Sequence, residues 1–289
     1  MGGFKMKRFL VPLFFVLHCG DASAYDKSLI GGREVGDGEY GEVVRITNGR
    51  ASCSATLIGR KVLLTAAHCT SEGGSVRFEY KREVFNAVCA LAPDYRQQVG
   101  DQDMALCKLD KEYPGALASV SDKGPTLGEE VILIGYGCIN PGGGGGNDGI
   151  LRVGAAPVTR ESDEQYYSFH TKGSSALCFG DSGGPSFSMS TPDTHNYVIG
   201  VNSRGNIRDL SLLTAVYHPK SREFMTSWAQ SGSETLLICG LNTQCDSEEP
   251  PPEKCQPEFE RFEKRAKQLE RAQKRFERAQ KKYEQCMQK

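Results

Sequence analysis

The middle of the chain consists of short runs of β-branched and apolar residues separated by Gly, Asn and Ser. The runs are Val43–Thr47, Ala55–Ile58, Val62–Thr65, Val76–Tyr80, Phe85–Ala90, Met104–Leu109, Glu130–Tyr136, Tyr197–Val201 and Leu212–Tyr217. Helical periodicity is almost absent before Lys220. Many short strands at such spacing predict an all-β barrel or sandwich architecture.

The length and composition narrow the class of protein further. A chain of 289 residues holds one large or two ordinary domains. Its 38% hydrophobic and 25% charged residues exclude a wholly disordered chain and a polytopic membrane protein. The net charge of −1 gives the whole chain no electrostatic reason to bind nucleic acid, although residues 253–289 carry +5 and residues 25–252 carry −8.

The first 24 residues have the features of a secretory signal peptide. Basic residues between positions 5 and 8 precede the apolar run Phe9–Leu17, and Ala22-Ser23-Ala24 follows it. This run is too short for a membrane-spanning helix, which needs about 20 residues. We expect cleavage after residue 24 and a secreted or periplasmic protein. The alternative is a lipidated Cys19, but the bulky His18 stands where a small residue would be expected.

The cysteine count fits an exported protein. Removal of the signal peptide leaves ten of the eleven cysteines, an even number in an oxidising compartment, so disulfide bonds are expected. A metal site is the competing possibility, but no Cys and His pairs repeat at zinc-finger spacing. The sequence therefore predicts neither a metal nor a cofactor.

The composition changes sharply near the C-terminus. The acidic, proline-rich segment Asp246–Pro252 lies within a Cys- and Pro-rich linker predicted over residues 239–256. From Phe259 to Met287, core-type residues alternate spacings of three and four, which is an a/d heptad pattern. The sequence predicts one long α-helix over residues 257–289.

Four roles are open for this helix. A homotypic coiled coil is favoured because the a/d spacing holds throughout, although Gln273 and Gln280 at core positions would weaken it while helping to set its register. The helix could instead dock alone on the folded domain, or attach to an acidic surface. Nucleic acid is the least favoured partner because regularly spaced acidic residues interrupt the positive face.

Two cysteines of this region cannot bond to each other within one straight helix. Cys255 and Cys286 are 31 residues apart, which is about 46 Å at 1.5 Å per residue. A disulfide needs Cα atoms within about 7 Å. The pair would therefore bond between chains or with Cys239 and Cys245, unless the helix folds back.

Three fragments carry residues with chemical significance. They are Leu64–Cys69 (LTAAHC), Asp103–Leu106 (DMAL) and Gly180–Pro185 (GDSGGP). Each alone has a structural explanation, because a histidine after a strand is more often structural and Gly-Asp-Ser-Gly-Gly is a plausible tight turn. Together they stand in the chain order His, Asp, Ser, one of the three known orders of a serine hydrolase triad.

In these motifs the chain resembles the trypsin/chymotrypsin family of serine peptidases, over about Leu29 to Trp228. The resemblance implies an all-β fold of two six-stranded antiparallel β-barrels with the active site in the cleft between them. It places a protease domain over residues 29–238. It also implies hydrolysis of peptide bonds in protein or peptide substrates.

The chemistry of this family explains why these residue types are needed. A serine hydroxyl is a poor nucleophile at neutral pH and requires an adjacent base, here the imidazole of His68. By the resemblance, Asp103 fixes the imidazole tautomer and Ser182 attacks the scissile carbonyl. The backbone amides of Gly180 and Ser182 would form the oxyanion hole.

Three disulfides are expected near these motifs. The pairs are Cys53 with Cys69, Cys89 with Cys107, and Cys138 with Cys178. The resemblance implies the first, and the second joins cysteines on neighbouring predicted strands. Cys178 lacks the partner that is usual in the family, because residues 206–213 contain no cysteine, so Cys138 is the natural substitute. A free buried thiol at Cys178 is the alternative.

The predicted primary pocket departs from trypsin. In relatives the residue six before the nucleophile forms the floor of this pocket, and trypsin-like enzymes place an aspartate there to bind Arg or Lys. This chain has Ala176, with Leu177, Ser203 and Gly205 around it. Because an unpaired guanidinium is costly to bury in a pocket without negative charge, we expect a preference for medium or small apolar residues before the scissile bond.

Activation by cleavage is implied by the segment Leu29–Gly32. In relatives a similar Ile-Val-Gly-Gly stretch begins the mature chain, and its amine pairs with the aspartate before the nucleophile, here Asp181. Residues 25–28 would then be a short propeptide that an activating protease removes. Ser28 stands where a basic residue usually precedes the cut, and the nearest base is Lys27, so activation could also proceed differently.

The sequence therefore predicts an exported serine endopeptidase that works through a Ser182 acyl-enzyme. The rival hypothesis is a binding protein, in which a protease-like domain is held in the inactive zymogen state and delivered by an oligomerising tail. The complete triad opposes this rival, and the unusual activation segment favours it.

Overall fold

The structure, a computed structural model, describes residues 29–36, 38–96, 101–145, 148–189 and 196–245. Several predicted features lie outside the described residues: the signal peptide 1–24, the propeptide 25–28, the linker beyond residue 245, the helix 257–289, Cys255 and Cys286. These features stay predictions. Among the described residues, no helix has the length and apolarity that crossing a membrane requires.

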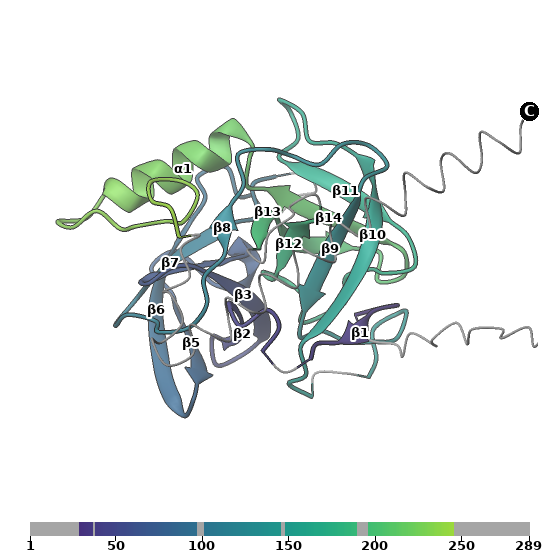
Figure 1. Ribbon diagram of the computed structural model, residues 1–289, viewed down its shortest axis with the longest axis horizontal. Helices are drawn as coiled ribbons and strands as arrows, with labels where there is room; N and C mark the ends of the chain where they lie inside the picture. The colour runs from purple at the N-terminus through teal and green to yellow at the C-terminus, as the bar shows by residue number, and fades with distance from the viewer. Residues whose placement is uncertain (1–28, 37, 97–100, 146–147, 190–195, 246–289) are drawn as a thin grey trace, which may run out of the picture.

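Six antiparallel strands close into a first barrel (Figure 1). In order around the barrel they are β2 (Val43–Thr47), β3 (Ser52–Gly59), β4 (Val62–Thr65), β7 (Ala105–Leu109), β6 (Glu83–Leu91) and β5 (Ser75–Tyr80). All four residues of β4 are buried, which explains why its sequence is a continuous apolar run rather than an alternating one. Phe78, Phe85 and Tyr113 pack ring against ring in the core.

The second barrel closes in the same way. Its order is β9 (Glu130–Gly135), β10 (Arg152–Arg160), β11 (Ser168–Lys172), β14 (Leu210–Ala215), β13 (Tyr197–Gly205) and β12 (Pro185–Ser188), with β12 pairing back to β9. The short strand β1 (Arg33–Glu34) adds to β10, and β8 (Ser119–Val120) pairs in parallel with β13. The predicted fold of two six-stranded antiparallel barrels is confirmed.

One α-helix of the described region, α1 (Pro219–Gln230), follows the second barrel. His218 caps its N-terminus by accepting a hydrogen bond from the Lys220 amide, and Pro219 occupies the first turn, where no amide is needed. Its buried residues recur at helical spacing and are Ser221, Phe224, Met225 and Ala229. Phe224, Met225 and Ala229 join a core cluster that contains residues of both barrels.

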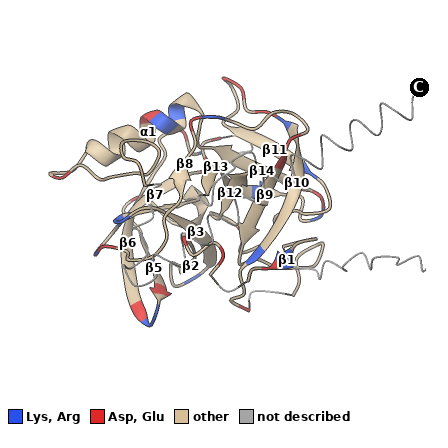
Figure 2. Cartoon of the chain, viewed as in Figure 1, with Lys and Arg blue, Asp and Glu red and all other residues tan. Residues whose placement is uncertain are grey.

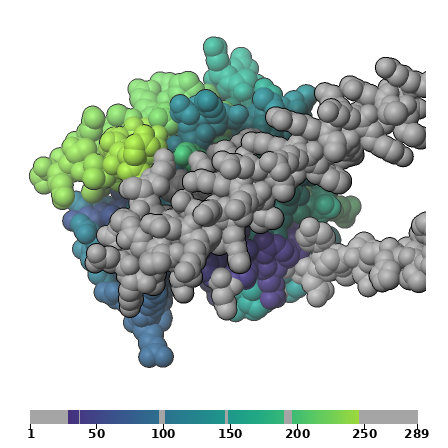
Figure 3. All heavy atoms as spheres, in the orientation of Figure 1, coloured from purple at the N-terminus to yellow at the C-terminus, as the bar shows by residue number. Residues whose placement is uncertain are grey.

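The described chain ends against the first barrel. The Cys239 amide donates to the Ile58 carbonyl at 2.8 Å, and in Figure 3 the yellow-green end of the described chain lies beside the blue residues of that barrel. Cys239 is buried and forms a disulfide with Cys245. The alternative in which these two cysteines pair with Cys255 or Cys286 is therefore wrong.

Charges of both signs are mixed on the described surface. The tip of the β5–β6 hairpin and the helix α1 each carry acidic and basic residues (Figure 2). On the hairpin, Glu83 forms an ion pair with Lys111 at 2.6 Å, and on α1, Glu223 pairs with Lys220 at 3.0 Å. The electric fields of the two charges in such a pair largely cancel at a distance. A bound molecule therefore responds mainly to the charged residues in direct contact with it.

Candidate active site

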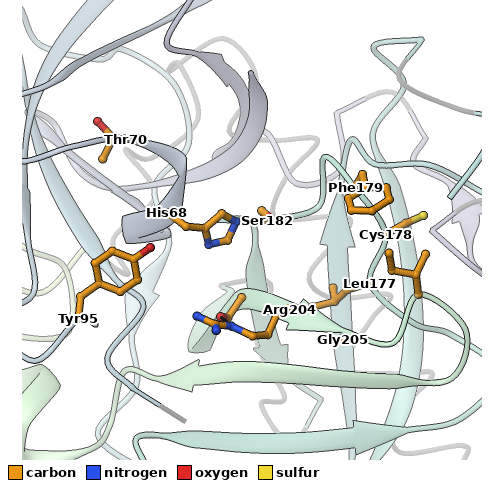
Figure 4. Close-up of a pocket in the computed structure, with 11 residues that line it drawn as sticks. His68, Thr70, Tyr95, Leu177, Cys178, Phe179, Ser182, Arg204 and Gly205 are labelled. Carbon is orange, nitrogen blue, oxygen red and sulfur yellow. Dashed lines mark hydrogen bonds between the residues drawn. The ribbon is translucent and has the colours of Figure 1, made fainter. Parts of the chain in front are cut away.

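Residues of both barrels line one cleft of about 530 Å³. His68, Thr70 and Tyr95 come from the first barrel, and the other lining residues come from the second barrel and its loops (Figure 4). The residues of the second barrel are Leu177, Cys178, Phe179, Ser182, Ser203, Arg204, Gly205 and Ile207. The predicted catalytic histidine and serine therefore lie in the same cleft.

Strand pairing brings His68 and Asp103 together. β4 pairs with β7 so that Thr65 lies opposite Ala105. Thr65 is three residues before His68, and Ala105 is two residues after Asp103. His68 lies on a 3-10 turn, Ala67–Cys69, directly after β4. The disulfide between Cys53 and Cys69 anchors this turn to β3.

His68 and the Asp103 carboxylate form two hydrogen bonds, one through the imidazole and one through the backbone amide of His68. His68 Nδ1 lies 2.7 Å from Asp103 Oδ2, and the backbone amide of His68 donates to Oδ1 at 3.0 Å. The His68 side chain is 34% exposed, whereas that of Asp103 is 1% exposed. The ring can therefore face the cleft while its partner is shielded from water.

Asp103 is held in its ionised form by its neighbours. Burial raises the pKa of its carboxyl, but the hydrogen bonds from His68 and Ser203 outweigh this effect and hold the pKa below its usual value. The Ser203 hydroxyl donates to Asp103 Oδ2 at 2.5 Å. An ionised carboxylate at this position is what a protonated imidazole needs during proton transfer.

Ser182 lies half-buried beside the imidazole of His68 in the cleft (Figure 4). Its carbonyl accepts a hydrogen bond from the Ser54 amide at 2.8 Å, which attaches the serine turn to β3. Gly183 makes this contact possible, because a Cβ there would lie 2.1 Å from Thr65 Oγ1. The glycine after the nucleophile therefore lets the two barrels meet at the site.

The peptide groups around Gly180 are fixed by two hydrogen bonds. The Cys138 amide donates to the Phe179 carbonyl at 2.9 Å, so in this trans peptide the Gly180 amide points to the opposite side. The Gly180 carbonyl accepts from the Ser54 hydroxyl at 2.8 Å, and the φ of +103° at Gly180 suits glycine. These contacts orient the proposed oxyanion donor.

Ser54 is a residue that motif reasoning missed. Its hydroxyl accepts a hydrogen bond from the Tyr136 amide at 3.0 Å while donating to Gly180. It thereby connects the loop before Ser182 to the end of β9 and to β3. Nothing in the local sequence indicates this role, because the loop it contacts is 126 residues away.

We expect Ser54→Ala to lower kcat about tenfold with little change in KM, since a buried acceptor or donor left unsatisfied costs roughly 1–3 kcal/mol. The Gly180 carbonyl would lose its donor, and the adjacent amide would be held less firmly toward the developing oxyanion. Steady-state kinetics on a peptide substrate would measure the effect. Ser52→Ala is the matched control on the same strand, because its hydroxyl bonds Ile46 and Arg45 instead. Equal kcat values for the two variants would contradict the role of Ser54.

The predicted pocket residues take different positions. Leu177, Ser203 and Gly205 line the cleft. Ala176 is fully buried beneath it, where it forms a bridge with Ile30. Ala176, the expected floor of the primary pocket, therefore does not line the described cleft.

The other predicted cysteines also come together. Disulfides join Cys89 with Cys107 and Cys138 with Cys178. The second of these ties the loop after β9 to the loop that precedes Ser182, and Ile207 packs on it. Cys53, Cys69 and His68 offer atoms within 4.8 Å of one another, but the two sulfurs are bonded to each other and so supply no thiolate ligand.

Asp181 is fully buried. Its carboxylate accepts hydrogen bonds from the Gly137 and Cys178 amides, both at 2.8 Å. Burial nevertheless raises its pKa to about 7. Leu29 is buried in the core of the second barrel, and the Ala176 amide donates to the Ile30 carbonyl at 3.0 Å. These contacts hold Ile30 beside Ala176, which is five residues before Asp181 in the chain.

Comparison with known proteins agrees with this geometry. Residues 29–223 match the family model described as Trypsin. Serine protease SP24D of Anopheles gambiae is 25% identical over 197 residues, covering 60% of this chain and 70% of that protein. Trypsin of Saccharopolyspora erythraea is 26% identical over 204 residues, covering 61% and 86%. Snake venom serine protease 1 of Craspedocephalus gramineus is 28% identical over 141 residues, covering 44% and 55%.

The family match covers about two thirds of the chain and includes the cleft residues His68 and Ser182 and the buried Asp103 behind the imidazole. The relatives are named as serine proteases at modest identity. The chain therefore belongs to the trypsin family and is a serine endopeptidase.

Proposed function

We propose that the protein cleaves peptide bonds through a covalent acyl-enzyme on Ser182. The observation that carries this proposal is the pairing of His68 with a buried, ionised Asp103 beside the Ser182 hydroxyl. The sulfur of Cys178, another potential nucleophile in the described cleft, is in a disulfide and so supplies no thiolate.

In the proposed reaction, Ser182 Oγ attacks the carbonyl carbon while His68 Nε2 takes the hydroxyl proton. The C=O electron pair moves to oxygen, and the amides of Gly180 and Ser182 stabilise the resulting oxyanion. Collapse of the tetrahedral intermediate breaks the C–N bond, and His68 gives its proton to the leaving amine. Water then attacks the acyl-enzyme by the same route, which releases the acid product and restores Ser182.

The residue before the scissile bond is proposed to be apolar and of medium or small size. Ala176, Leu177 and Gly205 bring no charge to the primary pocket. A library of peptides that differ at this one position would test the proposal through kcat/KM. A dominant preference for Arg or Lys would contradict it.

Export and proteolytic activation complete the proposal. Removal of residues 1–28 would leave a free amine at Leu29, and this amine is proposed to pair with the buried carboxyl of Asp181. The pKa of about 7 on Asp181 lies above the value of 3.8 for an unperturbed aspartate. Before cleavage, the contribution of Asp181 to the free energy of unfolding is therefore present at low pH, where the carboxyl is protonated, and it is lost as pH rises through about 7. An ion pair with the new amine would remove this loss, because it favours the ionised carboxylate.

Covalent labelling tests the enzyme against the rival binding protein. We expect an organophosphorus serine reagent to label the form that begins at Leu29, on Ser182, and to label the form with residues 25–28 more slowly. Mass spectrometry of the labelled peptide would identify the residue, and Ser182→Ala is the control. A correctly folded Leu29 form that fails to react would favour the binding protein, which the unusual Ser28 before the activation segment first suggested.

A further inference from the structure

Arg204 places a fixed positive charge in the cleft. It lies on β13 between Ser203 and Gly205, and its side chain is 29% exposed. Among the described residues that line the cleft, Arg204 is the only one of the four charged types Lys, Arg, Asp and Glu. A substrate that enters the cleft therefore meets a cation close to the reacting groups.

The contacts of Arg204 position its guanidinium without using all of its donors. Nε donates to the Ser203 hydroxyl at 3.2 Å. Nη2 lies 3.5 Å from Asp101 Oδ1 and 3.7 Å from Asp103 Oδ2, both near the outer limit of an ion pair. A guanidinium has five N–H donors in a planar fork, which suits two-point binding of a carboxylate. These contacts leave donors available for a further acceptor.

The guanidinium lies on one side of the cleft. In Figure 4 it is on the side of His68 and Tyr95, whereas Leu177 and Phe179 line the other side. In the proposed mechanism the residue before the scissile bond, P1, occupies the pocket beside Leu177. The guanidinium then faces the residues that precede P1 in the substrate, P2 to P4.

Tyr95 adds a second polar group on the same side. Its hydroxyl points toward His68 (Figure 4), and the oxygen is buried without a hydrogen-bond partner in the described part of the chain. Burial raises the pKa of this phenol to about 12, so it stays protonated at neutral pH. A phenol that keeps its proton can donate a hydrogen bond to a carboxylate, as the guanidinium can.

We propose that Arg204 selects substrates with an aspartate or glutamate side chain at one of the positions P2 to P4. This inference rests on the proposed function. An acidic side chain there would gain a charge-assisted hydrogen bond that its amide counterpart lacks. The alternative is that Arg204 only holds Asp101 and Asp103 in place. In that case the charge of the substrate would not matter.

Paired peptides test this proposal. Each pair shares one apolar P1 residue and carries Glu or Gln at P2, P3 or P4, and kcat/KM is measured for the form that begins at Leu29. We expect Glu to exceed Gln by about tenfold at one of these positions at low salt, and the ratio to fall as salt is raised. Arg204→Gln should bring the ratio to about one, and Arg204→Lys should retain part of it because the charge remains.

Arg208→Gln is the matched control. Arg208 is an exposed arginine on the turn after β13 and does not line the cleft, so its loss should leave the Glu to Gln ratio unchanged. A wild-type ratio within twofold of one at all three positions would overturn the proposal, as would a ratio that Arg204→Gln does not change. Hydrolysis of the Gln peptides would still support the protease in either case. Failure of the wild type on every peptide would instead contradict the proposed function.

Discussion

Ser182→Ala is expected to lower kcat about a millionfold, because the variant lacks the atom that forms the acyl-enzyme. Substrate binding should change little, since the cleft keeps its lining residues and the oxyanion donors are backbone amides. What activity remains would come from the oxyanion hole and from substrate positioning, through direct attack by water. Steady-state kinetics on a sensitive fluorogenic peptide would measure the loss.

The fold of this variant should be intact. The hydrogen bond of Ser182 to the first barrel uses its carbonyl, which accepts from the Ser54 amide and is present in alanine as well. The free energy of unfolding should therefore stay within about 0.5–1 kcal/mol of the wild type. A well-folded Ser182→Ala protein that keeps more than a tenth of wild-type kcat would show that another group is the nucleophile.

The strands of the first barrel were predictable because their own residues favour them. β4 and β7 are short apolar runs, and the pairing of these two strands is what brings His68 and Asp103 together. β10 was not predicted, because Gly154, Ala155 and Pro157 are poor strand formers. It forms because β9 pairs with its first part and β11 with its last. This tertiary pairing overrides the local preference.

The same distinction applies to the site. The motifs around His68, Asp103 and Ser182 are local in sequence, so they could be found without a structure. The role of Ser54 depends on a contact 126 residues away. Arg204 is next to Ser203 in the chain, but a register shift between Asn202 and Arg204 breaks the alternation of side chains. Its direction into the cleft therefore required coordinates.

Asp103→Asn is expected to lower kcat about ten-thousandfold by changing the tautomer of His68. Oδ1 of Asp103 accepts a hydrogen bond from the His68 backbone amide, so the side-chain oxygen of an asparagine should occupy the position of Oδ1. The asparagine NH₂ would then replace Oδ2 and donate toward His68 Nδ1. The imidazole would carry its proton on Nε2 instead, and Nε2 could no longer accept the proton of Ser182.

Asp101→Asn is the matched control for this variant. Asp101 also lies near Arg204, but its carboxylate is not hydrogen-bonded to the imidazole. We therefore expect less than a tenfold change in kcat for this neighbour at the same pH. Labelling by the organophosphorus reagent should slow in Asp103→Asn, because the reagent also needs an activated serine. If Asp103→Asn and Asp101→Asn lost activity to the same small extent, the carboxylate would act on the cleft through its general charge, and the tautomer argument would be wrong.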